Sequence, residues 1–254
     1  MTTARDIPIP YRIVALIQER NRLFSYPLER VAGDIWSAKF RCTSCGACCT
    51  KAVNNHIFLL DRDAERVKTI DPGAYEPAPD PEFCDQNGML YVSGYALKMK
   101  NDNRGSCWFL EDGRCGIYEQ RFSGCRIYPH MLRRSAGVPG TVSWRQFARL
   151  GSHGRYDPAF SFEECLTIAR EVKEYENAYL TQQIAFLETI HEYFAIHKLL
   201  HDPAIHKQNM QRFAQGSPVD IKVFHSGELE EFRIARTDSS RKGIIISHPS
   251  HDYP

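Results

Sequence analysis

The sequence predicts an α+β protein that is mainly helical and is built around an irregular, cysteine-rich core. Apolar residues recur at helical spacing in residues 11–29 and 161–200, which indicates amphipathic helices. The segment between them, residues 40–129, holds eight of the nine cysteines and is interrupted by proline and glycine. Such interruptions favour loops and short strands over long regular elements.

The first half of the chain contains further local signals. Pro27, after Ser25 and Tyr26, predicts a bend or restart in the first helix, because proline lacks the N–H that a helix interior needs. Residues 61–69 predict a short helix opened by an Asp cap. Residues 56–60 and 89–92 are expected to be extended.

In the second half, Ser161 and Glu164 predict a capping box at the start of a helical stretch that runs to about Leu200 as more than one helix. We expect a shorter helix over 204–213 and a hairpin around the turn at Ser226-Gly227-Glu228. The polar tail after Arg236 predicts disorder. The predicted organisation has four parts: an N-terminal helical segment (1–37), a metal-binding domain (38–165), C-terminal helices (166–213) and a hairpin with a tail (214–254).

Composition narrows the class of protein. The net charge of +1 gives no sign of a nucleic-acid binder. No window approaches the roughly 20 apolar residues of a membrane span, and the N-terminus has no apolar secretory segment. These features predict a cytoplasmic protein that binds neither nucleic acid nor membrane. Cytoplasmic thiols stay reduced, so nine cysteines point to metal ligation rather than to disulfides.

Four cysteines within eight residues are the strongest chemical signal: Cys42, Cys45, Cys48 and Cys49. Cysteines two residues apart can wrap three corners of an iron–sulfur cubane, a spacing that bacterial ferredoxins use. Zinc modules more often use two such pairs far apart. In an extended chain, neighbouring side chains point to opposite sides, so Cys48 and Cys49 favour two neighbouring sites over one.

Thiols elsewhere in the sequence complete the set of predicted metal ligands. Cys107, Cys115, Cys125 and Cys165 bring the predicted ligands to eight, enough for two sites of four. We expect Cys84, in an acidic and proline-rich loop, to stand outside the metal site. His130 and His153 could each replace a thiol, but we interpret both as structural.

These residues resemble the YkgJ-type cysteine-cluster family, described as a zinc- or iron-chelating domain with up to eight cysteines. The resemblance lies in Cys42-x-x-Cys45-Gly46-x-Cys48-Cys49, then Cys107-Trp108-Phe109-Leu110, and then the stretch from Gly113 to Pro129. Two departures are Phe122, where the family usually has proline, and the long insertion between Cys49 and Cys107. A related domain occurs in flagellin lysine N-methylase.

Residues beside the thiols complete the predicted site. We expect Arg121 and Arg126, on either side of Cys125, to offset the negative charge of a thiolate-ligated cluster. Tyr118 and Tyr128 are expected to pack over the site and exclude water.

The functional hypothesis is an iron–sulfur protein that holds one or two [4Fe–4S] clusters. It would act in electron transfer or as an accessory to a redox or maturation system, with a protein partner. A structural zinc-binding adaptor, a cluster-dependent protein lysine methyltransferase and a metal-delivery factor remain open alternatives, and the sequence leaves open whether the protein is an enzyme.

Overall fold

A computed structural model describes residues 7–54, 56–131, 133–134, 142–143, 153–156, 160–236 and 244–247. Its helices are α1 (Ile9–Ser25), α2 (Leu28–Ala38), α3 (Asp61–Ile70), α4 (Ser123–Ile127), α5 (Phe162–His197) and α6 (Pro203–Ala214), with 3₁₀ turns η2 (Ala47–Cys49) and η3 (Tyr118–Gln120). Its strands are β1 (Phe40–Arg41), β2 (Ile57–Leu59), β3 (Tyr75–Pro77), β4 (Phe83–Cys84), β5 (Leu90–Val92), β6 (Tyr95–Leu97), β7 (Leu110–Glu111), β8 (Arg114–Cys115), β9 (Arg133–Arg134), β10 (Val142–Ser143), β11 (Arg155–Tyr156), β12 (Val219–His225), β13 (Glu228–Arg236) and β14 (Ile244–Ser247). The α+β prediction is confirmed.

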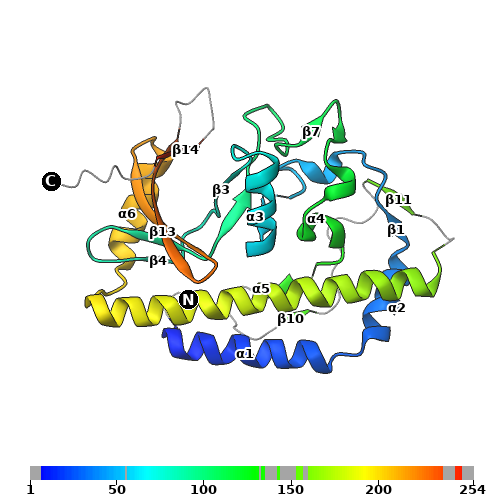
Figure 1. Ribbon diagram of the computed structural model, residues 1–254, viewed down its shortest axis with the longest axis horizontal. Helices are drawn as coiled ribbons and strands as arrows, with labels where there is room; N and C mark the ends of the chain where they lie inside the picture. Colours follow the sequence, from blue (N-terminus) through cyan, green and yellow to red (C-terminus); the bar gives the residue numbers. More distant parts are fainter. Residues whose placement is uncertain are drawn as a thin grey trace.

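The long helix α5 spans the molecule, and α1 and α2 pack along it (Figure 1). Its 36 residues correspond to a length of about 54 Å. The predicted capping box between Ser161 and Glu164 is present. The prediction of more than one helix over this stretch was wrong. Nothing between Phe162 and His197 is proline or glycine, and the packed apolar face continues from Cys165 to Phe194.

The predicted break in the first helical stretch is confirmed. Helix α1 ends at Ser25 and α2 begins at Leu28, with Pro27 as the residue that precedes the new helix. Proline fixes its own φ and cannot donate a helical hydrogen bond, so the chain turns there. Helix α2 then carries the chain to β1 and the cysteine loop.

Two sheets lie on the side of α5 that is opposite to α1 in Figure 1. The larger sheet has the order β14-β13-β12-β5-β4, in which β12 and β5 are parallel, and the smaller has the order β2-β6-β3. The predicted hairpin is confirmed as β12 and β13. Ser226 and Gly227 both have positive φ, as a two-residue hairpin turn of type I′ requires.

The tail prediction needs a correction. Residues 244–247 form β14, which pairs with β13 at the sheet edge, so this part of the tail is ordered rather than disordered. The other residues after Arg236 lie outside the described part of the chain, and the predicted division into four segments stays a prediction.

Helix α3 begins where the sequence placed it, but without the predicted Asp cap. Leu60 precedes the helix, and Asp61 is its first residue, so Asp61 stabilises the helix dipole rather than capping the helix. None of the helices in the described part of the chain combines the length and apolar character that crossing a membrane requires.

His225, at the end of β12, joins the larger sheet to α3. Its Nδ1 lies 3.3 Å from a carboxylate oxygen of Asp61, and its Nε2 contacts the Glu65 carboxylate. The nearby Asp61 carboxylate raises the pKa of His225, burial opposes this shift, and Glu65 adds to it. The imidazole is only 4% exposed, whereas the Asp61 and Glu65 side chains are 33% and 60% exposed, so the carboxylates of this cluster are partly in contact with water.

We therefore predict a stability that depends on pH through His225. Because the pKa is raised in the folded protein, the stabilisation is present in full below the unfolded value of about 6.5 and is lost as the pH rises through the folded value. His225→Gln should lower the free energy of unfolding by about 1–3 kcal/mol at pH 6 and by less at pH 8. Urea unfolding followed by circular dichroism measures this, with the exposed His191→Gln as the control. An equal loss at both pH values would contradict the assignment.

Candidate metal centre

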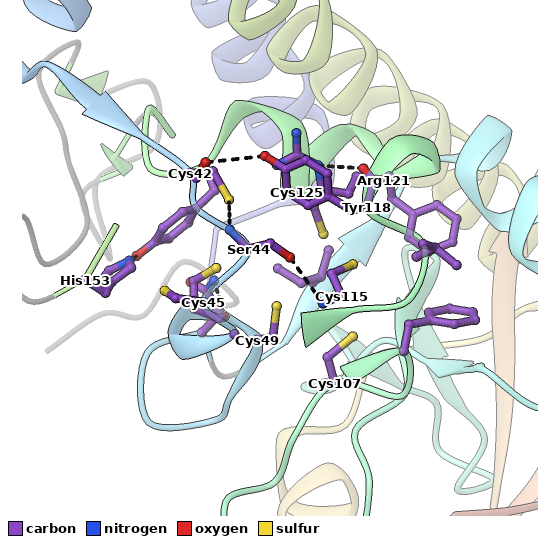
Figure 2. Close-up of a pocket in the computed structure, with 18 of the residues that line it drawn as sticks. Cys42, Ser44, Cys45, Cys49, Cys107, Cys115, Tyr118, Arg121, Cys125 and His153 are labelled. Carbon is purple, nitrogen blue, oxygen red and sulfur yellow. Dashed lines mark hydrogen bonds between the residues drawn. The ribbon is translucent and has the colours of Figure 1, made fainter. Parts of the chain in front are cut away.

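Seven of the nine cysteines line one pocket. They come from four parts of the chain: the 42–49 loop, the segment after β6, the hairpin β7–β8 and helix α4. The pocket thiols are those of Cys42, Cys45, Cys48, Cys49, Cys107, Cys115 and Cys125. In Figure 2, the side chains of Cys49, Cys107, Cys115 and Cys125 surround a common space, and Cys45 lies on the side of His153. All are free thiols.

The 42–49 loop adopts a turn that only glycine at position 46 allows. Gly46 has a φ of 72°, and a Cβ there would lie 2.8 Å from both the Gly113 carbonyl oxygen and a Leu110 methyl carbon. The loop is therefore pressed against the hairpin β7–β8, which carries Cys115. Gly46 in the cysteine motif therefore allows a close backbone approach.

Cys48 and Cys49 face the same pocket, contrary to the premise of the two-site prediction. They lie in the 3₁₀ turn η2 rather than in an extended chain, closed by the hydrogen bond from Cys49 N–H to the Gly46 carbonyl at 3.0 Å. Their thiols are hydrogen-bonded to each other, which raises the pKa of Cys48 and lowers that of Cys49. The geometry therefore does not require two separate sites.

Backbone hydrogen bonds hold the remote cysteines against this loop. Cys107 N–H donates to the Cys49 carbonyl at 2.7 Å, and Lys51 N–H donates to the Gly105 carbonyl at 3.1 Å. Cys115 N–H lies 3.4 Å from the Ser44 hydroxyl oxygen, a contact drawn in Figure 2. Cysteines far apart in sequence are thus brought together without any bond between their sulfur atoms.

Helix α3 fixes the entry to α4, which carries Cys125. The Asp63 carboxylate is 1% exposed and accepts a hydrogen bond from Ser123 N–H at 3.1 Å. Arg66 donates to the Gln120 carbonyl at 2.8 Å and its guanidinium lies over the Phe122 ring. The sequence analysis missed both residues, because charges on a helix usually mark its solvated face.

The pocket is mostly apolar, and this shapes the thiol chemistry. Its non-cysteine walls include Phe40, Ile57, Leu97, Met99, Phe109, Ile117 and Phe122. Burial raises the pKa of Cys107 to about 12 and also raises the pKa values of Cys115 and Cys125, where neighbouring thiols add to the effect. Ligand thiols must lose their protons, so metal binding here would release protons and weaken in acid.

Cys45 differs from these buried thiols. The backbone N–H of Ala47 lowers its pKa, partial burial opposes this, and the N–H of Gly154 adds to the lowering. Cys45 is also the exposed cysteine of the pocket. Thiolate character and access to solvent therefore coincide at the 42–49 loop.

Arg121 and Tyr118 lie where the sequence placed them, beside the thiols. The Arg121 guanidinium is 3.9 Å from the Tyr118 ring centroid, and its Nε donates to the Tyr118 carbonyl at 2.9 Å. Its positive charge favours thiolate at Cys49, Cys115 and Cys125. The Tyr118 hydroxyl lies 3.4 Å from the Cys42 carbonyl oxygen (Figure 2).

Tyr128 and His153 form the opposite wall. The Tyr128 hydroxyl oxygen is 2.9 Å from His153 Nε2, and both rings pack edge-on against Phe40. The sequence analysis interpreted His153 as structural, yet it lines the pocket together with the seven thiols. His130 is buried and does not line it.

Two predicted site residues are not brought to the pocket, and both are corrections. Cys165 is 0% exposed and packs on α5 with Val31, Ile35 and Ile127 in the core between α2, α4 and α5. Arg126, on α4 next to Cys125, is exposed, and its Nε lies 3.7 Å from the Glu171 carboxylate. One residue along a helix turns the side chain by about 100°, which carries Arg126 away from the thiols.

Cys84 stands apart, as the sequence indicated. It lies in β4, fully buried in the main core, where burial raises its pKa to about 11. Its surroundings are Asn209 and the backbone of Asp85. Cys84 is therefore a core residue, and its removal is expected to lower the stability of the fold.

The donor set fits a thiophilic metal, although the thiols are not gathered at ligating spacing. Among the described residues, no group of three Cys, His, Asp or Glu side chains is already positioned to hold a metal ion. The pocket has an open volume of about 50 Å³, against the roughly 10–15 Å³ that one water needs. Seven soft sulfur donors around such a space suit zinc or iron.

Comparison with known proteins supports this assignment. Residues 41–149 match the family model CxxCxxCC, described as "Putative zinc- or iron-chelating domain". The matched stretch contains all seven pocket cysteines, from Cys42 to Cys125, and confirms the resemblance to the cysteine-cluster family. No curated protein and no solved structure matches the chain.

We predict that the pocket cysteines, and not the two core cysteines, determine metal content. Changing Cys42, Cys45, Cys48 or Cys49 singly to Ser should lower the bound metal, because each thiol lines the pocket. Cys84→Ala and Cys165→Ala should keep it, and each should lose about 1 kcal/mol of stability, the cost of removing a methyl-sized buried group. Elemental analysis and thermal unfolding measure the two effects. Metal loss in Cys165→Ala would show that this thiol is a ligand after all.

Proposed function

We propose that the protein binds an iron–sulfur cluster in this pocket and uses it in electron transfer or as an accessory to a redox or maturation system. The observation that supports the proposal is the gathering of seven free thiols from four chain segments around one apolar space. The family match supports metal binding, and we propose in addition that the bound group is an iron–sulfur cluster.

The number and spacing of the thiols favour a cluster over a single zinc ion. A structural zinc site is closed by four ligands, whereas this pocket offers seven. Cys42, Cys45 and Cys48 have the two-residue spacing that cubane clusters use. The residues that would hold the cluster are drawn from these three together with Cys49, Cys107, Cys115 and Cys125.

The surroundings suit a cluster with a defined potential. A bound cluster would supply a site for one-electron transfer. The apolar walls exclude water and so disfavour added negative charge on a cluster, whereas the positive charge of Arg121 beside the thiolates favours the more negative, reduced state. The balance of these two effects would set the reduction potential. Cys45, at the exposed edge, marks the side that a protein redox partner would approach. The proposal requires reduced cysteines and therefore a reducing compartment such as the cytoplasm.

Anaerobic purification followed by iron, zinc and acid-labile sulfide analysis tests the proposal. We expect iron and sulfide in matching amounts, and a visible absorption band that bleaches with dithionite. The double variant Cys107→Ser/Cys115→Ser should lose both iron and sulfide, because it removes two remote donors. The matched control Cys84→Ala should retain them.

Zinc without sulfide would instead contradict the cluster and leave the structural zinc-binding adaptor as the function. That result would predict a colourless protein that captures a partner without any redox change.

A further inference from the structure

Helix α3 belongs to the long insertion between Cys49 and Cys107, yet it contacts the short helix α4 that carries Cys125. The two helices lie next to each other in Figure 1. Helix α4 has only five residues, and so short a helix has little stability of its own. The position of Cys125 therefore depends on the contacts that α4 makes with its neighbours.

The carboxylate of Asp63 on α3 makes the central contact. Its Oδ2 accepts a hydrogen bond at 3.1 Å from the backbone N–H of Ser123, the first residue of α4, and its Oδ1 lies 3.4 Å from the Arg66 guanidinium. The first N–H groups of a helix have no partner within the helix, so Asp63 supplies an acceptor that the start of α4 needs. Only 1% of Asp63 and 5% of Ser123 are exposed, so water cannot readily replace this bond.

Two arginines of α3 hold the residues around this contact. Arg62 donates to the Ser123 hydroxyl at 3.1 Å, and Arg66 donates to the Gln120 carbonyl at 2.8 Å. The Arg66 guanidinium also lies 5.6 Å from the centroid of the Phe122 ring. Helix α3 thus binds the turn before α4 through the backbone of that turn as well as through its side chains.

The contact continues from the start of α4 to the thiol. Phe122 is fully buried and lines the thiol pocket, and its carbonyl accepts a hydrogen bond from Cys125 N–H at 2.9 Å. Cys125 follows Ser123 by two residues, so a shift at the start of α4 moves the sulfur within the pocket. Asp63 does not line the pocket, so it acts on a metal there through Cys125 and not by direct contact.

We infer that Asp63 is a positioning residue of the metal centre, which holds Cys125, through Ser123, where its sulfur can coordinate a metal. The inference rests on the proposed function, because it gives the thiol a metal to bind, but the placement of the thiol can be measured without one. Removing the Asp63 carboxylate leaves the buried N–H of Ser123 without its acceptor, which loosens the start of α4.

Thiol labelling of the full-length protein, freed of metal with a chelator and kept reduced, tests the placement. Incorporation of N-ethylmaleimide at Cys125 is followed by mass spectrometry, with Cys107 as the reference in the same molecule. Asp63→Ala should label Cys125 on the order of tenfold faster than the wild type, because loss of a buried hydrogen bond lowers the cost of local opening. Asp63→Asn keeps an oxygen acceptor and should stay close to the wild type.

Asp202→Ala is the matched control. Asp202 caps α6 by accepting hydrogen bonds from two backbone N–H groups at 2.8 and 3.0 Å, and it does not line the thiol pocket. Its removal should leave the labelling of Cys125 unchanged. Wild-type labelling in Asp63→Ala, or equal increases in Asp63→Ala and Asp202→Ala, overturns the inference. If Asp63→Ala does not fold, Arg66→Ala decides: faster labelling of Cys125 supports the inference, and unchanged labelling overturns it.

The metal-loaded protein gives a second readout. With iron and sulfide bound, Asp63→Ala should change the electron paramagnetic resonance spectrum and the midpoint potential of the reduced centre, whereas Asp202→Ala should match the wild type. A wild-type spectrum and potential in Asp63→Ala overturn the inference and leave the cluster standing. Wild type without iron and sulfide contradicts the proposed cluster, and the labelling then decides the role of Asp63 by itself, so the two failures are distinguished.

Discussion

The pocket depends on the pairing of two backbone segments, the 42–49 loop and the stretch from Gly105 to Cys115. The hydrogen bond from Cys107 N–H to the Cys49 carbonyl and the close approach of Gly46 to Gly113 set the separation of the thiols that face each other. Neither contact involves sulfur. The scaffold can therefore present most of its thiols before a metal arrives, and the metal would supply the remaining attraction that draws them to ligating distance.

This scaffold reduces the extent to which the cysteine-rich region depends on a metal for its folding. A continuous apolar core, which includes Leu59, Val67 and Leu97, lies beneath the pocket and extends to strand β12. A protein of this kind is expected to keep its sheets and long helices without metal and to lose order only in the loops that carry the thiols.

The sequence predicted the parts of the fold that local chemistry determines. Pro27 broke the first helix, Ser161 and Glu164 capped α5, and the Ser226-Gly227 turn produced the hairpin, because each acts through residues close in sequence. It could not place Cys165, whose helical position suits a core thiol and a ligand equally well. It also could not foresee that a 3₁₀ turn aims Cys48 and Cys49 into one pocket, or that β1–β11 pairing brings His153 to it, because both depend on contacts across the fold.

Hydrogen exchange measured by mass spectrometry on the metal-loaded and the chelator-treated protein shows directly whether a metal joins the cysteine loops. We expect metal removal to increase exchange in the loops around Cys42–Cys49 and in residues 107–125, while α5 and the β12–β13 hairpin keep their protection. Unchanged exchange in the cysteine loops would mean that no metal joins these segments.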